Sequence, residues 1–545
     1  MSHLLLRALL GQAVFGACLA QAQLPPVPVP PENPITPAKA VLGKALFWDE
    51  QLSSDNTTAC ATCHIPSAGG GDPRSLAPEN LHPGPDGVFG TSDDRRGSRG
   101  VVRCAPDARF APDAHFFPRE QVTGRRAPSA IGAAWAPELF WDGRASSTFL
   151  DPLNQRVVAT QHAALESQAA GPLVSDVEMA CEMRSPQDVA TKLVVAKPLS
   201  LADRLTPDLR AALAVDPTYP ELFEAAFGDR SITPARIALA IATYERTLVP
   251  DQTPYDLGTL TPAQQRGLQA FRGNGACLFC HSEPLFTDHS YANLGVRPDS
   301  DDVGRFAVTQ NPADMGAFKV PALRNVGLSS TFFHNGGKRT LAEVIEFYRI
   351  GGEFPGPNLD VRFSPAFLSP AERADLVEFL RDGLTDPRVA AELPPFDRPR
   401  LASERAATRV ARYGYGTSGT GGIAPVLVAP HPAFLGNPRF TLGVARALGG
   451  SQSLLGFATA AAPAGLLLGS QPLWIAPTSW FAGVSLPLAG APGLGGSGYE
   501  SLALPIPADP LLDGQTLYVQ AFVFDPAGVD GLAVSGGAAL RLFGI

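Results

Sequence analysis

The sequence predicts a mainly α-helical region followed by an all-β, sandwich-like region at the C-terminal end. Its 545 residues, 45% of them hydrophobic, are enough for two or three domains that each have a core. Apolar residues recur at helical spacing in residues 234–248 and 369–380. Residues 426–545 instead contain short apolar runs between Gly and Pro turns. With 54 Gly and 53 Pro, a large share of the chain is expected in loops.

The first residues predict an export signal. Residues 1–22 contain Arg7 within an apolar run that is too short to span a membrane, followed by a small-x-small cleavage site at Ala20–Ala22. The Pro-rich stretch that follows cannot continue a helix. We therefore expect a signal peptide over 1–22 and a protein that is periplasmic or otherwise exported. A buried N-terminal helix and a lipid-anchored signal at Cys18 are the alternatives.

Four of the seven cysteines fall into two identical C-x-x-C-H motifs. This spacing lets two thiols add to the vinyl groups of a haem while the adjacent histidine reaches the iron. A redox dithiol or half of a zinc site would leave the histidine after each pair unexplained. The sequence therefore predicts two covalently bound c-type haems. Their attachment and axial residues are Cys60, Cys63 and His64 for the first and Cys277, Cys280 and His281 for the second.

The other cysteines predict one disulfide. Once Cys18 is removed with the signal peptide, Cys104 and Cys181 remain as an even pair in an oxidising compartment. A bridge between them is the expected outcome, and two buried free thiols are the alternative. The net charge of −9 argues against a nucleic-acid partner, because nucleic-acid binding sites are basic.

Several separated stretches resemble the bacterial di-haem cytochrome c peroxidases and their relatives of the MauG type. The likeness runs from about Asn33 to Arg388 in the same order and spacing apart from insertions. It rests on LGKALFWDEQLSSDNTTACATCHIP, RRAPSAIGAAW, LFWDGRA, LESQAAGPL, VEM, IALAIATYERTL, the second C-x-x-C-H motif and GAFKVPALRNVGLSSTFFHNGG.

The resemblance implies two cytochrome-c-like, mainly helical domains with one haem each. We place an N-terminal, peroxidatic haem domain at 23–248 and a C-terminal, electron-transfer haem domain at 249–395. Residues 396–425 are basic and then Gly/Ser-rich, as expected of a linker. Residues 426–545 contain no Lys, Cys or Met and form the predicted β-rich domain, whose role the sequence leaves open. His431 in that domain is expected to be structural.

The resemblance also implies the residues of the first haem site. Gln168 and Glu178 match two distal polar positions of the family. A peroxidase must move a proton between the peroxide oxygens, so Glu178 is the candidate acid–base and Gln168 would orient peroxide or water. Trp141 matches a tryptophan that lies between the haems and is the candidate electron relay. Each residue taken alone would more often be a surface or core residue.

At the second haem the sequence departs from the peroxidases. Their sixth ligand is a methionine, but Tyr348 occupies that position, as in MauG. A phenolate is a hard anionic ligand that favours ferric iron and lowers the reduction potential. The alternative is that Tyr348 is a packed core residue and Met315 reaches the iron.

Two histidines concern the haem surroundings. Classical members cap the first iron with a histidine in the resting state, and His115 is the candidate here, although it stands too early in the chain. We favour an open site over this cap. His334 matches a position near the second haem and is expected to be structural.

Calcium is a further cofactor that the resemblance implies. Members of the family bind one ion between their domains, but Arg126 stands where they have a contributing Asn, which counts against that site. Separately, residues 84–94 resemble an acidic calcium loop, with Asp86, Asp93 and Asp94 as oxygen donors. A plain solvated loop is the alternative.

Three functions compete. The first is a di-haem peroxidase that reduces hydrogen peroxide to water, with electrons passing from the haem at His281 by Trp141 to the haem at His64. The second is a MauG-like oxidase of a protein or other organic substrate, and the third a non-catalytic di-haem electron carrier. The implied partners are hydrogen peroxide and a donor protein such as a small cytochrome c or a cupredoxin. A homodimer is usual in the family.

Overall fold

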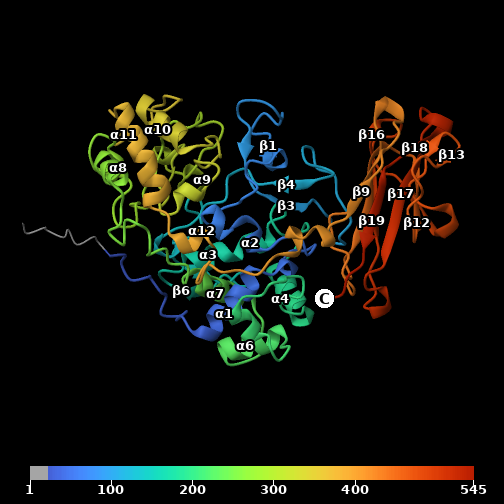
Figure 1. Cartoon of the computed structure of the whole chain (residues 1–545), viewed down its shortest axis with the longest axis horizontal. Helices are drawn as coiled ribbons and strands as arrows, with labels where there is room; N and C mark the ends of the chain where they lie inside the picture. Colours follow the sequence, from blue (N-terminus) through green and yellow to red (C-terminus); the bar gives the residue numbers. More distant parts are fainter. Residues whose placement is uncertain (1–22) are drawn as a thin grey trace, which may run out of the picture.

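The computed structural model describes residues 23–545, so the predicted signal peptide lies outside the described residues. Figure 1 shows two helical regions and a β region that stands at one edge of the molecule. The strands nearest to the β region are β3 (Arg99–Val102) and β4 (Glu120–Val122). No helix within residues 23–545 is both long and apolar enough to cross a membrane.

The first helical region is built around α1 (Pro37–Phe47) and α7 (Pro234–Glu245), which pack against each other. Each begins with proline after a threonine N-cap, Thr36 or Thr233, whose side chain accepts a backbone N–H of the first turn. Gly43 permits the close approach, because a Cβ there would lie 1.9 Å from a backbone oxygen of α7. The other helices of this region are α2 (Cys60–Cys63), α3 (Ala164–Ala170), α4 (Pro186–Val195), α5 (Pro207–Ala212) and α6 (Tyr219–Phe227).

The second helical region pairs α8 (Pro262–Arg272) with α11 (Pro370–Glu378). Thr261 and Ser369 cap these helices, and each forms a capping box with the third helical residue. The core of this region contains a cluster of aromatic rings from Tyr255, Phe271, Phe286 and Phe379. Its remaining helices are α9 (Phe306–Thr309), α10 (Leu341–Ile350) and α12 (Pro387–Ala390), and a π-helical turn (Phe379–Gly383) follows α11.

Long connections join these helices. Within residues 23–395 they contain four two-stranded antiparallel sheets. These sheets are β1 (Leu81–His82) with β2 (Arg95–Arg96), β3 with β4, β5 (Phe149–Leu150) with β6 (Val157–Ala159), and β7 (Tyr291–Ala292) with β8 (Phe318–Lys319). Helices are the longest elements of residues 23–395 and form the packed cores, as expected. Much of the remaining chain is in loops.

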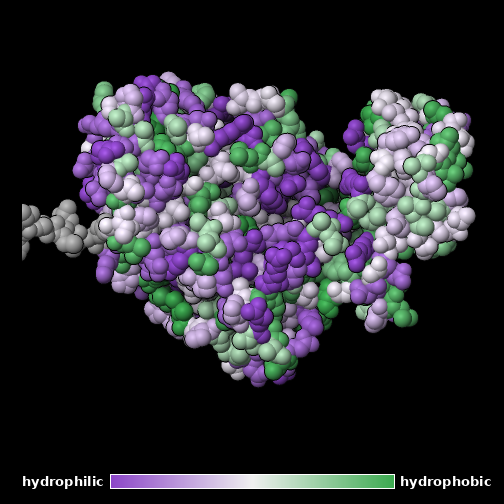
Figure 2. Space-filling view, viewed as in Figure 1, coloured by the Kyte–Doolittle hydropathy of each residue, from purple (hydrophilic) through white to green (hydrophobic). Residues whose placement is uncertain are grey.

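The C-terminal region is sheet-rich, as predicted; its two larger antiparallel sheets share one hydrophobic core, and β13 and β14 form a further two-stranded sheet. The smaller sheet has the order β10-β11-β16, and the larger has the order β15-β12-β17-β19-β9, with β18 also paired to β17. Figure 2 shows that this region presents a less hydrophilic surface than the helical regions on the face in view. The strands are β9 (Ala411–Tyr413), β10 (Val426–Val428), β11 (Thr441–Leu448), β12 (Gln452–Ala458), β13 (Leu467–Leu468), β14 (Gln471–Pro472), β15 (Trp480–Pro487), β16 (Gly495–Ala503), β17 (Thr516–Phe524), β18 (Leu532–Val534) and β19 (Gly537–Arg541).

Residues 396–425, which the sequence predicts to be a linker, contain ordered structure. β9 pairs with β19 and forms an edge of the larger sheet. Earlier in the segment, the backbone N–H groups of Ala402 and Ser403 donate to the carboxylate of Glu50 at 2.8 and 3.1 Å. Burial raises the pKa of Glu50 to about 7, so these bonds satisfy a group that water does not reach. The segment is therefore attached at both ends.

The β region packs on the loop that follows β3. Phe110 of this loop is buried against Val428 and Ala445, and its backbone N–H donates to Ser501 at 3.0 Å. Farther along the loop, Phe117 makes an edge-to-face contact with Tyr499 at 5.5 Å between ring centroids. The appended region thus has a defined apolar contact with the first helical region.

Cys104 and Cys181 form the predicted disulfide, which joins the loop after β3 to the segment that follows α3. We expect the double variant Cys104→Ser/Cys181→Ser to lose about 4 kcal/mol of unfolding free energy, because the bridge closes a separation of 77 residues. Denaturant unfolding of wild type and variant, both with haem, measures this difference. Equal midpoints and slopes in the two proteins would show that the bridge does not contribute to stability.

Candidate functional site

The first C-x-x-C-H motif lines a cavity of about 730 Å³. Cys60 and Cys63 lie on α2, and Thr62 fixes the turn by accepting the backbone N–H of Ala59 at 2.9 Å. The Nδ1 atom of His64 lies 3.0 Å from the carbonyl oxygen of Gly70. Because Nδ1 donates to this carbonyl, Nε2 carries the lone pair and is free to bind a metal. Burial lowers the pKa of His64, which favours the neutral, metal-binding form.

The second motif repeats this arrangement beside a cavity of about 250 Å³. Nδ1 of His281 lies 3.0 Å from the carbonyl oxygen of Phe286, so its Nε2 is also free. Burial lowers the pKa of His281 and raises the pKa of the Cys277 thiol to about 12. Neither cysteine pair is oxidised, and no group of three or more His, Cys, Asp or Glu in residues 23–545 could hold a metal ion. The zinc alternative therefore has no support in the described residues.

Several polar atoms that line the two cavities are buried without a hydrogen-bond partner in the protein. Such atoms are costly unless a ligand satisfies them, and a haem brings both a flat apolar ring and two carboxylates. In the first cavity they are Ser98 Oγ, Arg99 Nε, Arg126 Nε and Glu245 Oε2, and in the second they are His289 Nε2 and Asn325 Nδ2. Three of the atoms in the first cavity, those of Ser98, Arg99 and Arg126, are hydrogen-bond donors. The lining of this cavity therefore fits a haem, whose propionates are acceptors.

Glu178 and Gln168 both line the first cavity. Burial raises the pKa of Glu178 above its usual value, although Ser175 and the charge of Arg144 partly oppose this effect. Gln168 lies on α3, and Glu166 on the same helix forms a buried ion pair with Arg246 at 2.7 Å. The helix is therefore held in place by one carboxylate, while the amide two residues later lines the cavity.

Trp141 lines both cavities and is buried. Its Nε1 donates to the carbonyl oxygen of Arg126 at 2.7 Å, and its own carbonyl accepts the backbone N–H of Lys319 at 2.8 Å. The side chains shared by the two cavities form a wall between them. This wall consists of Arg126, Pro128, Ser129, Ala133, Leu139, Trp141 and Asp302.

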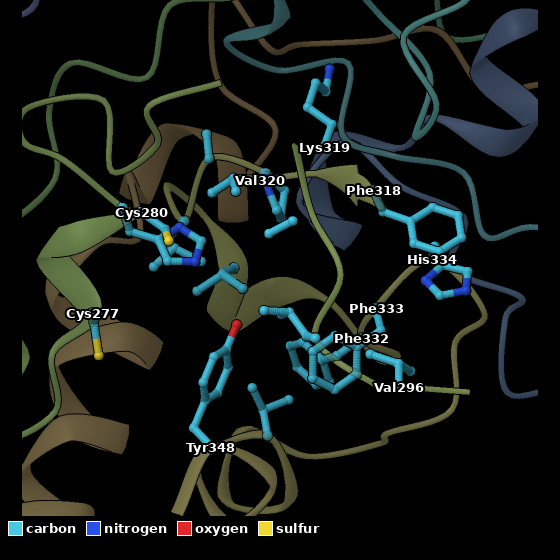
Figure 3. A pocket seen from close by; sticks show the side chains of 18 of the residues that line it. Cys277, Cys280, Val296, Phe318, Lys319, Val320, Phe332, Phe333, His334 and Tyr348 are labelled. Atoms are coloured by element: carbon cyan, nitrogen blue, oxygen red, sulfur yellow. The ribbon is translucent and has the colours of Figure 1, made fainter. Parts of the chain in front are cut away.

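Tyr348 lines the second cavity from helix α10. Figure 3 shows its hydroxyl directed into the cavity, with Cys277 and Cys280 on one side and Phe332 and Phe333 on the other. Burial raises the pKa of the phenol well above its usual value. Met315 does not line this cavity. The structure thus brings Tyr348, and not the alternative methionine, to the second motif.

The structure places the histidines as follows. His115 is exposed and lies outside the first cavity, next to Phe116, so the alternative of a capping histidine is not supported. The segment between β2 and β4 carries it to the surface instead of into the site. His334 stacks on Phe318 at 3.5 Å between ring centroids and contacts Trp141 edge to face at 6.4 Å, which fits its predicted structural role.

The acidic loop of residues 84–94 uses its carboxylates within the loop. Asp93 accepts the backbone N–H of Asp86 at 3.1 Å, and Asp86 accepts that of Val88 at 2.7 Å. Asp94 accepts the N–H of Gly90 at 2.8 Å. The three carboxylates thus accept hydrogen bonds from backbone N–H groups of their own loop. Calcium binding there stays a prediction.

Sequence reasoning missed the cationic and hydroxyl groups that line the first cavity. Ser98 and Arg99 belong to β3 or its approach, and nothing in their local pattern distinguishes them from surface residues. The sequence presents Arg126 only as a substituted calcium position. The one signal in the sequence is that Arg125 and Arg126 open the matched stretch RRAPSAIGAAW.

Comparison with known proteins agrees with these two sites. The family described as "Di-haem cytochrome c peroxidase" matches residues 37–260. The methylamine utilization protein MauG of Methylorubrum extorquens is 31% identical over 376 residues, covering 68% of this chain and 84% of that protein. Cytochrome-c peroxidase IdrP1 of Denitromonas iodatirespirans is 28% identical over 420 residues, covering 70% and 89%. The crystal structure of a MauG-like protein associated with microbial copper homeostasis matches with a TM-score of 0.50 at 26% identity, covering 69% and 96%.

The chain therefore belongs to the di-haem cytochrome c peroxidase and MauG family. It is an oxidoreductase of the cytochrome c peroxidase type that carries two c-type haems.

Replacing one cysteine pair should remove one haem and leave the other. We expect Cys60→Ser/Cys63→Ser and Cys277→Ser/Cys280→Ser each to retain one covalent haem, because each thioether pair forms independently on its own motif. Haemochrome absorbance and the mass of the denatured chain measure the number of haems. Cys104→Ser/Cys181→Ser is the matched control and should keep two haems. Two haems retained in either of the first variants would contradict the assignment.

Proposed function

We propose that this protein reduces hydrogen peroxide to water, with electrons relayed from the C-terminal to the N-terminal haem. The observation that carries this proposal is that Glu178 and Gln168 line the cavity of the first C-x-x-C-H motif. Overall, H2O2 accepts two electrons and two protons and yields two molecules of water. Each bound haem supplies an iron that exchanges electrons and, at the first site, a coordination position for peroxide.

Glu178 is the proposed acid–base group. Cleavage of the O–O bond needs the proton of one peroxide oxygen to move to the other, which then leaves as water. A carboxylate with a raised pKa accepts a proton more readily than a solvated glutamate does, and a pKa closer to the operating pH still lets the group return it. The amide of Gln168 does not exchange a proton near neutral pH, and it would hold peroxide or water by hydrogen bonds. Both roles need the side chains to stay within the cavity.

Trp141 is the proposed relay between the two sites. Its ring lies in the wall shared by both cavities, and two hydrogen bonds fix the residue. We further propose a small cytochrome c or a cupredoxin as the electron donor. The net charge of −9 is compatible with a basic donor, because complementary charge speeds association.

The substitution Glu178→Gln should slow the reaction with peroxide by about 10²–10⁴-fold, because it removes the proton acceptor but keeps the shape. In the wild type the rate should rise with pH through a pKa above the usual glutamate value, since only the ionised carboxylate accepts a proton. Stopped-flow mixing with peroxide across acidic and neutral pH measures both effects, and the pH-dependent limb should vanish in the variant.

Glu182→Gln is the matched control for this experiment. Glu182 follows Glu178 on the same segment, does not line the cavity and is paired with Arg103 at 2.7 Å. Its variant should keep the wild-type rate and pH limb. A wild-type rate in Glu178→Gln would remove Glu178 from the mechanism.

Tyr348 favours a second candidate function, a MauG-like oxidation of a protein or other organic substrate. The phenol is directed into the second cavity and packs against Phe347 and Phe363, which hold it there. As an anionic ligand it would stabilise ferric iron and keep the potential of the second haem low. A haem held by this phenolate would be expected to react with peroxide without prior reduction, whereas a methionine-ligated haem of higher potential would hold an electron first.

The variant Tyr348→Met should gain a low-spin haem that is reduced more readily, since axial ligands set haem potentials over about 0.8 V. Electronic and EPR spectra during peroxide titration measure this change, and the wild type should react without added reductant. Tyr348→Phe separates the oxygen from the ring, because it keeps the aromatic packing. If the spectra of all three proteins coincide, Tyr348 is only a packing residue.

A further inference from the structure

Arg126 stands at the centre of the wall between the two cavities and lines both. Its backbone is fixed on both sides. The N–H donates to the carbonyl oxygen of His334 at 2.8 Å, and the carbonyl accepts Trp141 Nε1 at 2.7 Å. Its guanidinium carbon lies 5.7 Å from the centroid of the Trp141 ring. The backbone hydrogen bonds and the Trp141 ring therefore hold Arg126 in place beside both cavities.

The guanidinium of Arg126 has no partner among residues 23–545. It forms no ion pair, and its Nε is buried without a hydrogen-bond acceptor. Burial alone lowers the pKa of Arg126 to about 10, with no carboxylate to oppose it. The group nevertheless stays charged at neutral pH.

The neighbouring Arg125 shows why nearby carboxylates do not serve Arg126. Arg125 binds both oxygens of Asp302 at 2.7 and 2.8 Å and one oxygen of Asp142 at 2.7 Å. Asp142 also accepts two bonds from Arg144. These two acidic groups are thus already paired, and Arg126 remains as a half-buried cation without a carboxylate partner, its Nε fully shielded from water.

An unpaired buried cation is strongly unfavourable unless an anion reaches it. Each haem carries two propionate carboxylates, and the planar guanidinium matches the two oxygens of a carboxylate. Because Arg126 borders both cavities, the carboxylates of either haem can approach it. No other arginine is common to the lining of both cavities in the part of the chain that the structure describes.

We propose that Arg126 is the binding and positioning residue for haem propionates at the junction of the two sites, and that its fixed charge raises the reduction potential of at least one haem. A positive charge close to a haem stabilises the reduced form, which carries one positive charge fewer. This inference rests on the two haems occupying the two cavities, but not on Glu178 or on peroxide as substrate.

The test compares Arg126→Gln, Arg126→Lys and the control Arg156→Gln as di-haem proteins. Arg156 is exposed, forms no ion pair within the described residues and lines neither cavity, so its variant removes the same charge elsewhere. Spectroelectrochemical titration without peroxide gives the potential of each haem. Resonance Raman spectra of the propionate bending modes report directly on their hydrogen bonds.

We expect Arg126→Gln to lower the equilibrium constant for reduction of at least one haem by about tenfold, which is about 59 mV for a one-electron couple. Its propionate bands should shift as well. Arg126→Lys keeps the charge and should stay within about threefold of the wild type. Arg156→Gln should match the wild type in both measurements.

Two results would overturn the proposal. The first is that Arg126→Gln has the potentials and propionate bands of the Arg156→Gln control. The second is that Arg126→Lys and Arg126→Gln shift equally, because the fixed charge would then not be the cause. If Arg126→Gln fails to retain both haems, Arg126→Lys decides the question: potentials near the wild type support the proposal, and a tenfold shift contradicts it.

Discussion

The buried ion pairs of Arg125 hold the two haem regions together at the wall between their cavities. Arg125 belongs to the first region, whereas Asp302 comes from the second, and the two bind through both carboxylate oxygens. Burial alone would raise the pKa of Asp302, but the hydrogen bonds and charge of Arg125 bring it below its usual range. Both side chains are largely shielded from water, with exposures of 20% and 9%, so the loss of either partner would leave a poorly solvated charge at the wall. The position of Trp141, the separation of the cavities and the surroundings of Arg126 all depend on it.

A paired and an unpaired cation are adjacent in the chain at this wall. Arg125 is paired with Asp142 and with Asp302 of the wall, while Arg126 belongs to the wall, has no ion pair and lines both cavities. The same division occurs on α3, where Glu166 is neutralised by Arg246 and Gln168 lines the first cavity. In each case a buried ion pair holds the backbone that presents a free polar group to the site. Several of the buried polar atoms without a protein partner line the two cavities, where a bound haem would supply partners for them.

Much of this organisation follows from local sequence. The helical spacing of residues 234–248 and 369–380 predicts helices that the structure contains, and the even cysteine pair forms the predicted disulfide. Four residues that the family resemblance predicts to lie at the haem sites line the two cavities: Glu178, Gln168, Trp141 and Tyr348. Their chemical roles are proposals. The failures concern contacts between distant segments. β9 gains its partner 124 residues later in β19, counted from Tyr413 to Gly537, and no local pattern predicts that pairing. His115, the alternative to the favoured open site, lies at the surface because its loop carries it away from the first cavity.

The β region is connected to the first site by a continuous chain of contacts. It packs on Phe110, whose loop begins at Cys104, and the disulfide joins Cys104 to Cys181. The strand before this loop, β3, lies directly against the segment that bears Glu178. This close approach requires glycine at position 100, because a Cβ there would lie 2.0 Å from the carbonyl oxygen of Val177 and 2.6 Å from the Cα of Glu178. The loop that carries the β region is therefore connected to the backbone of Glu178 by the disulfide on one side and by β3 on the other, within a close-packed interior.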